Sequence, residues 1–247
     1  MSEHYFIGTS GWSYAQWEGI FYPPNLPMSE QLIYYSQQFN SVELNSSFYH
    51  VPSAKNVMHW SEITPPDFIF SCKASRYLTH IKKLSDYQKG LKNLFSSLQH
   101  FQHKLGPILF QLPPKWSLNL ERLNLFLKAL PGGYQYTFEF RDRSWLCNET
   151  FDLLKKFKVA LCFYDYRGFQ APYEVLSDFI YLRLHGPFET PYQGHYSGQS
   201  LQQYANRIID WSRGRSNIFC YFDNDQKVAA PQDAMQLLVF LKNVKMR

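Results

Sequence analysis

The 247-residue chain carries as many aromatic rings (6 Trp, 18 Tyr and 21 Phe) as formal charges (25 Lys and Arg, 20 Asp and Glu). Its mean hydropathy of -0.37 and this aromatic content exclude wholesale disorder, because disordered chains cannot bury enough apolar surface to offset the entropy of ordering. No run of about 18 apolar residues is present, which excludes a transmembrane helix. The net charge of +5 permits an anionic partner without requiring one.

The start of the chain and its cysteines favour a cytoplasmic protein. Met1 to His4 leads directly into the strand-like run Tyr5-Phe6-Ile7, with no basic segment or apolar signal core. The four cysteines form no CxxC pair, and three of them lie inside apolar runs, where a free thiol behaves as a small hydrophobic group. A reducing compartment is therefore expected.

Short β-rich runs alternate along the chain with longer segments of helical period. The predicted strands are Tyr5–Gly8, Val42–Asn45, Ile69–Lys73, Ile108–Gln111, Tyr136–Arg141, Val159–Tyr164, Ile180–His185 and Ile218–Asp223. The predicted helices are Ser29–Phe39, Ala54–Ile63, Ser85–Phe101, Asn119–Leu130, Asn148–Lys156, Gly198–Trp211 and Pro231–Lys245. The connection over 168–178 is predicted to be irregular.

This alternation predicts parallel strands joined by crossover helices. Eight β/α repeats in about 250 residues fit a single closed TIM-like (β/α) barrel of mostly parallel strands, with one domain over residues 1–247. Gly8-Thr9-Ser10-Gly11 follows the first strand but lacks the glycine spacing and the lysine of nucleotide-binding loops. A dinucleotide-binding fold is therefore rejected.

Polar side chains share one face of three predicted strands near their carboxyl ends, where TIM-barrel enzymes build their sites. These side chains are Glu43 and Asn45, Glu139 and Arg141, and Arg183 and His185. Other strands end on Lys73, on Gln111 and on Asp223-Asn224-Asp225. Ion pairs that only fill the barrel interior are the structural alternative. Because burying so many charges is costly without partners, we predict a site for a polar ligand at this rim.

The residue types narrow the chemistry of the predicted site. Lys73, Arg141 and Arg183 would bind an anionic group, since guanidinium can grip two oxygens at once. Glu43, Glu139 and His185 are predicted to transfer protons. His80 and His195 lie on the third and seventh βα loops, where the first could reach the rim and the second could belong to a lid.

A metal is the less favoured alternative, and no cofactor is expected. Glu43, Glu139, His185 and either Asp223 or Asp225 would supply oxygen ligands and one imidazole suited to Mg²⁺ or Mn²⁺. The neighbouring arginines would repel a cation. A nucleophilic serine has little support, because Ser10 does not lie in a G-x-S-x-G motif.

Several motifs, in order over nearly the whole chain, resemble the YecE-like family (domain of unknown function seventy-two). They include Gly8-Thr9-Ser10-Gly11-Trp12-Ser13-Tyr14, Val42-Glu43-Leu44-Asn45, Gln111-Leu112-Pro113-Pro114, Glu139-Phe140-Arg141, Arg183-Leu184-His185-Gly186 and Tyr221-Phe222-Asp223-Asn224-Asp225. The resemblance implies a TIM-like barrel and supplies no established reaction. Asp223 stands where the resemblance leads us to expect Asn, and Pro187 where a basic residue is common, which puts a role for Asp223 and one anion contact in doubt.

We therefore expect an acid–base enzyme for a small anionic or polyol-type substrate, by hydrolysis, elimination or isomerisation. The residues expected to bind it are Lys73, Arg141, Arg183, Asn45, Gln111, Asn224 and Asp225, with the rings of Trp12, Tyr14 and Tyr49 as walls. The alternative is a nucleic-acid-binding or nucleic-acid-processing protein, because loop rings can stack on bases while Lys and Arg contact phosphates. No membrane partner is expected, and the oligomeric state is left open.

Overall fold

The computed structural model describes residues 5–214 and 217–245. Its strands are β1 (Tyr5–Thr9), β2 (Ser41–Leu44), β3 (Ile69–Lys73), β4 (Leu105–Leu112), β5 (Tyr136–Phe140), β6 (Ala160–Tyr166), β7 (Phe169–Gln170), β8 (Phe179–Leu184) and β9 (Asn217–Phe222). All eight predicted strands are present, with ends shifted by up to three residues. The additional strand, β7, forms a short antiparallel hairpin with β6 inside the connection that was expected to be irregular.

The seven predicted helices are also present. They are α1 (Met28–Gln38), α2 (Ala54–Ile63), α3 (Tyr87–Leu98), α4 (Leu120–Ala129), α5 (Asn148–Lys156), α6 (Gly198–Arg213) and α7 (Ala229–Lys245). The third is shorter than expected, because α3 gives way at Gln99 to a separate helical turn over Gln99–Lys104 that contains non-helical backbone at Gln102. A π-helical turn, η3 (Tyr77–Ile81), precedes α3.

Strand order confirms the predicted fold class. The hydrogen-bonded order is β1-β9-β8-β6-β5-β4-β3-β2, and an isolated parallel bridge joins Ser10, directly after β1, to Glu43 in β2. Strands that follow one another through helices in parallel sheets are the pattern of α/β barrels. The fold is therefore α/β, of the TIM-like (β/α) barrel class.

The chain divides into two compact units. The first unit comprises residues 1–43, 163–171 and 178–247, and the second comprises residues 44–162 and 172–177. Strand β6 contributes its first three residues to the second unit and the rest to the first. A single domain over residues 1–247 stays a prediction.

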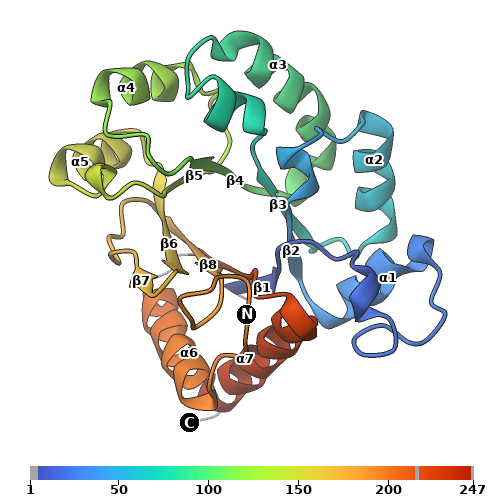
Figure 1. The fold of residues 1–247 in the computed structure, drawn as a ribbon. Helices are drawn as coiled ribbons and strands as arrows, with labels where there is room; N and C mark the ends of the chain where they lie inside the picture. Colours follow the sequence, from blue (N-terminus) through green and yellow to red (C-terminus); the bar gives the residue numbers. More distant parts are fainter. Residues whose placement is uncertain (1–4, 215–216, 246–247) are drawn as a thin grey trace. The chain divides into compact units, whose positions relative to one another are not determined.

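In the first unit, β1, β9 and β8 pair in parallel, and α6 and α7 lie side by side (Figure 1). Gly8 in β1 allows a close approach of the chain, because a Cβ there would lie 2.0 Å from the Ser41 carbonyl oxygen. The neighbouring residue, Thr9, donates its backbone N–H to the Tyr35 hydroxyl of α1. The Gly8–Gly11 segment thus fixes α1 against β1.

In the second unit, β3, β4, β5 and the start of β6 pair in parallel. Phe110 stacks on Phe138, Phe138 on Phe140 and Phe140 on Trp145, with ring centroids 5.1 to 5.9 Å apart. The ring of Phe126 from α4 meets Phe110 edge-on. These apolar rings of β5 pack together while Glu139, between them, contacts polar groups, which confirms the predicted alternation along the strand.

The four cysteines are free, and Cys72, Cys162 and Cys220 are buried, as expected of small hydrophobic side chains. Within residues 5–214 and 217–245, no helix is both long enough and apolar enough to cross a membrane.

Candidate functional site

Arg183 is the centre of a buried polar cluster in the first unit. Its Nε lies 3.1 and 3.0 Å from the two carboxylate oxygens of Glu43, and its Nη2 lies 2.9 Å from Glu43 Oε1. The same Nη2 lies 2.9 Å from Asp223 Oδ2, and Nη1 lies 2.8 Å from His185 Nε2. We call Glu43, Arg183, His185 and Asp223 the Arg183 cluster. It gathers at the carboxyl ends of β2, β8 and β9, as the sequence predicted for strand-end polar residues.

Glu43 accepts hydrogen bonds from every side. Besides Arg183, the Ser10 hydroxyl donates to Oε1 at 2.6 Å and the Tyr181 hydroxyl donates to Oε2 at 2.6 Å. The side chain has no solvent exposure. Burial and the adjacent Glu43 carboxylate raise the pKa of the Tyr181 hydroxyl, which keeps it a hydrogen-bond donor. Because hydrogen-bond donors surround both of its oxygens, the Glu43 carboxylate is suited to holding the Arg183 guanidinium in place.

His185 has its tautomer set by its neighbours. Because a guanidinium can only donate, Arg183 Nη1 donates to the lone pair of His185 Nε2. The proton of the neutral ring then lies on Nδ1, which donates to the Asp165 carbonyl oxygen at 2.8 Å. The backbone N–H of His185 donates to the Asp165 carboxylate at 2.6 Å. The hydrogen bonds therefore favour a neutral His185.

Asp165 and Asp223 are the carboxylates here that reach solvent. Their side chains are 16% and 14% exposed, whereas those of Glu43 and His185 are fully buried. Tyr196 donates its hydroxyl to Asp165 and accepts the Gly186 N–H, and burial raises the pKa of that hydroxyl. Any small molecule that reaches the cluster would meet these two carboxylates first.

The loop after β1 carries the predicted aromatic wall. Tyr14 donates its hydroxyl to the Ser10 carbonyl oxygen, and the Trp12 carbonyl oxygen accepts the Tyr22 hydroxyl. Burial, with Asp223 as the next largest cause, raises the pKa of the Tyr14 hydroxyl. Both loop residues are partly buried. Their contacts fix the loop directly after the strand that carries Ser10.

Asp225 is held by the same loop. Trp17 Nε1 and Gln16 Nε2 donate to its two oxygens, each at 2.6 Å. Burial raises the pKa of Asp225 to about 6, and the two hydrogen bonds lower it by less. Asp225 therefore binds within its own unit to Trp17 and Gln16, rather than to members of the Arg183 cluster.

Asn224 takes part in a second small network. Its Nδ2 donates to Asp233 Oδ2 at 2.7 Å and to the Gly194 carbonyl oxygen at 2.8 Å. Asp233 also accepts the Tyr196 N–H and lies 2.9 Å from Nδ1 of the half-exposed His195. Among the described residues, buried Asn224 Oδ1 has no hydrogen-bond partner. This network secures the loop that carries Tyr196.

The second unit contains the other strand-end pair. Glu139 forms a salt bridge with Arg141, and the two side chains are 0% and 5% exposed. Gln111 Nε2 donates to Glu139 Oε1 at 3.1 Å from the neighbouring strand β4, where the two residues are in register. Cys162 Sγ lies 3.9 Å from the other oxygen of Glu139. Three predicted residues, Glu139, Arg141 and Gln111, are thus brought together.

Lys73 and His80 lie on either side of Phe48 in the second unit. The Lys73 ammonium lies 4.6 Å from the centre of the Phe48 ring, and the His80 ring meets that ring edge-on. Burial, followed by the positive charges of Lys73 and Arg76, lowers the pKa of His80 to about 4. Lys73 thus lies at the end of β3, and its role in binding an anion stays a prediction.

Asn45 and Tyr49 follow β2 into the second unit. Asn45 Oδ1 is buried, and no described residue hydrogen-bonds to it. The Tyr49 side chain is 70% exposed and contacts the Phe48 ring. Tyr49 thus stands in solvent, where it lines a pocket beside α3. The ligand-binding roles of Asn45 and Tyr49 stay predictions.

Several residues of the first-unit site were missed by the sequence prediction. Asp165 lies just beyond the predicted end of its strand at Tyr164, and strand β6 continues to Tyr166. Period-two alternation would not have identified it, because Asp165 shares its register with Phe163, which packs on Trp211 of α6. Tyr181, Tyr196 and Asp233 gave no signal in the sequence, because each has a hydrogen-bond partner in a distant segment, namely Glu43, Asp165 and Tyr196 respectively.

Within the described ranges, no group of three or more His, Cys, Asp or Glu side chains is arranged to hold a metal ion.

Comparison with known proteins gives a consistent family. The family model described as "Protein of unknown function DUF72" matches residues 6–246. UPF0759 protein YunF of Bacillus subtilis is 26% identical over 268 residues, which cover 96% of this chain and 94% of YunF. UPF0759 protein YecE of Escherichia coli is 28% identical over 137 residues, which cover 55% of this chain and 48% of YecE.

Solved structures agree with the fold. A crystal structure of a DUF72 family protein from Thermotoga maritima superposes with a TM-score of 0.85 at 28% identity and covers 98% of this chain and 99% of its own. A DUF72 family protein from Enterococcus faecalis has a TM-score of 0.79 at 17% identity, covering 96% of this chain and 95% of its own. The second likeness concerns the fold alone.

Proposed function

This chain belongs to the DUF72 family of proteins of unknown function, and on that premise we propose that it is an acid–base enzyme for a small polyol-type substrate bound at the Arg183 cluster. The observation that carries the proposal is a pair of partly exposed carboxylates in one buried network: Asp223 pairs with Arg183, and Asp165 contacts His185, which itself accepts a hydrogen bond from Arg183. Desolvated charges held in this way are typical of sites that transfer protons.

Charge favours a hydroxyl-rich substrate over an anionic one at this cluster. Glu43, Asp165 and Asp223 carry three negative charges against the one positive charge of Arg183, while the hydrogen bonds of His185 favour its neutral form. Carboxylates accept hydrogen bonds from hydroxyl groups and repel anions. Of the two substrate classes expected from the sequence, the polyol is the better match.

The roles divide by exposure. Asp223 is the proposed general base, because it is partly exposed and its Oδ2 is anchored by Arg183. Asp165, which accepts the Tyr196 hydroxyl, is the second carboxylate within reach of a ligand. Glu43 is fully occupied by donors, which supports a role in positioning Arg183 rather than in moving protons. Proton removal by Asp223 is a step common to hydrolysis, elimination and isomerisation.

The test is ligand binding by wild-type protein and two variants. Saturation-transfer NMR with neutral pentoses and hexoses, and with the matching sugar acids, should show binding of neutral members. Asp223→Asn should lose that binding, whereas Asp210→Asn should retain it, because Asp210 is 66% exposed on α6 and pairs with the exposed Arg213. Circular dichroism checks that both variants fold.

Equal binding by Asp223→Asn and wild type would overturn the site. Binding of the sugar acids in preference to neutral sugars would overturn the substrate class.

A further inference from the structure

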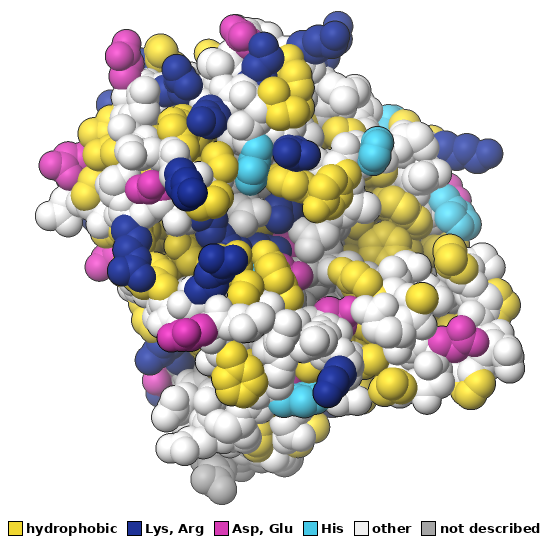
Figure 2. All heavy atoms as spheres, viewed as in Figure 1, with side chains coloured by type: hydrophobic (Ala, Val, Ile, Leu, Met, Phe, Trp, Pro, Cys, Tyr) yellow, Lys and Arg dark blue, Asp and Glu magenta, His cyan; other side chains and the backbone are white. Residues whose placement is uncertain are grey.

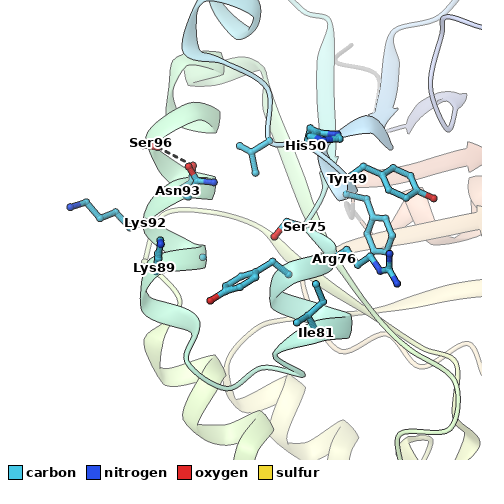
Figure 3. Close-up of a pocket in the computed structure, with 13 residues that line it drawn as sticks. Tyr49, His50, Ser75, Arg76, Ile81, Lys89, Lys92, Asn93 and Ser96 are labelled. Atoms are coloured by element: carbon cyan, nitrogen blue, oxygen red, sulfur yellow. Dashed lines mark hydrogen bonds between the residues drawn. The ribbon is translucent and has the colours of Figure 1, made fainter.

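A pocket of about 990 Å³ lies in the second unit, and none of its lining residues belongs to the Arg183 cluster. Three segments line it, namely the turn after β2, the turn after β3 and one side of α3. The lining residues used below include Tyr49, Arg76, Tyr77, Ile81, Lys89 and Lys92. Figure 3 shows Lys89, Lys92, Asn93 and Ser96 from α3 on one side and Tyr49 and Arg76 on the other. We call it the α3 pocket. Its volume is that of a small-molecule site.

The α3 pocket is positively charged. Arg76, Lys89 and Lys92 line it, and none of its lining residues is Asp or Glu. The nearby Lys82 is already paired with Asp86 at 3.0 Å. The second unit as a whole has sixteen Lys and Arg against nine Asp and Glu, and Figure 2 shows Lys and Arg side chains gathered over the part of the molecule where α3 and α4 lie. This charge selects an anionic ligand.

The same pocket exposes rings and an apolar side chain. Tyr49 is 70% exposed, Ile81 is 63% exposed and Tyr77 is 36% exposed. Large exposed side chains gathered in a concave site indicate a ligand with an apolar or aromatic part. Tyrosine rings stack on flat heteroaromatic groups. The neighbouring cations can bind a negatively charged group attached to such a ring. The pocket therefore suits a ligand in which a flat aromatic ring is joined to an anionic group.

The wall of the pocket is built by close packing. Gly90 lies in the first turn of α3, although glycine is a poorer helix former than alanine. A Cβ at Gly90 would lie 2.5 Å from Leu78 Cδ2 and 3.2 Å from Tyr77 Cδ1. Gly90 therefore lets α3 touch the π-helical turn η3, which carries Tyr77 and Ile81. Turns of this type are frequent at functional sites.

We propose that the α3 pocket binds a nucleotide phosphate, with the base against the tyrosine rings and the phosphate held by Arg76 and Lys89. The same chemistry is offered by a free mononucleotide and by the end of a single nucleic-acid strand, and both use a stacked base and a phosphate. This site does not depend on the Arg183 cluster, so its test and that of the proposed enzyme are independent.

The experiment is isothermal titration calorimetry with AMP, adenosine, inorganic phosphate and a ten-residue oligothymidylate, at 50 and 200 mM salt. AMP should bind at least ten-fold more tightly than adenosine or phosphate, because it offers both contacts. Binding should weaken with salt, as phosphate contacts do. Tyr49→Ala should lower AMP affinity roughly five-fold or more, the effect of losing a stacked base. Arg76→Ala with Lys89→Ala should abolish the preference for AMP over adenosine.

Lys128→Ala is the matched control, since Lys128 is an exposed lysine of α4 in the same unit and does not line the pocket. It should leave AMP binding unchanged. If the oligothymidylate binds tightly and AMP weakly, with both lost in Tyr49→Ala, the ligand is a strand. If AMP binds at least as well as the oligothymidylate, it is a free nucleotide. Absence of saturable binding by AMP and by the oligothymidylate at 50 mM salt would overturn the proposal, as would unchanged binding in the Arg76/Lys89 double variant.

Discussion

The two units differ in the sign of the charge that surrounds their buried groups. The first has nine Lys and Arg against eleven Asp and Glu, whereas the second has sixteen against nine. The titrating groups follow this difference. In the first unit, nearby carboxylates help burial to raise the pKa of Tyr14, and in the second, nearby cations help burial to lower the pKa of His80.

Because of this difference in charge, one chain can offer a carboxylate-rich site and a site rich in lysine and arginine. Carboxylates that face solvent beside Arg183 suit a ligand that donates hydrogen bonds, such as a polyol. A pocket lined by Lys and Arg, with no Asp or Glu among its lining residues, suits a ligand that carries negative charge. The predictions below test the two charge environments, in order of decreasing effect.

The largest effect is expected from Arg183→Met. Removing the guanidinium leaves Glu43 buried without its principal partner and deprives Asp223 and His185 of a donor. Breaking a buried ion pair from one side costs about 3–5 kcal/mol, because an uncompensated charge remains. Urea denaturation should show that loss in the free energy of unfolding.

The matched control is Arg213→Met. Arg213 is 74% exposed and pairs with the exposed Asp210, so its removal should change stability by no more than about 0.5 kcal/mol. A loss below about 1 kcal/mol for Arg183→Met would show that Glu43 and Asp223 find other compensation.

In the second unit, Lys104→Met removes a buried cation whose hydrogen bonds to described residues go to Ser61 and Thr64. Lys104 Nζ donates to the Ser61 and Thr64 carbonyl oxygens, where α2 ends, at 2.6 and 2.9 Å. Burial lowers the pKa of Lys104. Because helix-end carbonyls lose their donor, the free energy of unfolding should fall by about 1–3 kcal/mol.

Lys128→Met, on the exposed face of α4, should leave stability within about 0.5 kcal/mol of wild type. Equal stability of Lys104→Met and wild type would mean that water replaces the ammonium at the end of α2.

Nearly all helices and strands were predictable, because apolar residues recur with different spacings in strands and in amphipathic helices. The inward positions of Glu43, Glu139 and Arg183 were predictable for the same reason, since side chains on a strand alternate with period two. The contacts around them were not, because Tyr181 reaches Glu43, and Tyr196 reaches Asp165, from distant segments. The division into two units was not predicted, because no linker in the sequence marks it.

The α3 pocket could not be predicted. Tyr49, Arg76 and Lys89 come from three separate segments, and each alone has the pattern of a solvated loop or helix face. Only the packing of α3 on the turn before it, allowed by Gly90, brings these side chains around one hollow.

A smaller effect is expected on acidification, from His80 in the second unit. Its pKa is about 4 in the folded protein, below its ordinary 6.5, so the unfolded chain binds the extra proton between these values. Stability attributable to His80 is therefore complete above pH 6.5 and is lost as pH falls toward 4. Since the ring is half-buried, we expect a loss of about 1 kcal/mol at pH 4.5 relative to pH 7.

His80→Asn retains an acceptor for Thr79 and should lack this loss, as measured by urea denaturation at the two pH values. His59→Asn, at an exposed position of α2, is the control and should keep the wild-type pH dependence. A pH dependence unchanged in His80→Asn would contradict the influence of the positive surroundings.

The smallest effect has the opposite sign and comes from Asp225 in the first unit. Burial raises the pKa of Asp225 from 3.8 to about 6, so the folded protein binds the extra proton between those values, and stability falls as pH rises from 4 to 6. The side chain is partly exposed, which limits the effect to less than about 1 kcal/mol.

Asp225→Asn keeps an oxygen to accept the Trp17 N–H and should remove the fall in stability. Melting temperatures of both proteins from pH 4 to 7 would check this, with Asp210→Asn as the exposed control on α6. A wild-type curve parallel to that of Asp225→Asn would mean that Trp17 and Gln16 stabilise the carboxylate enough to cancel its burial.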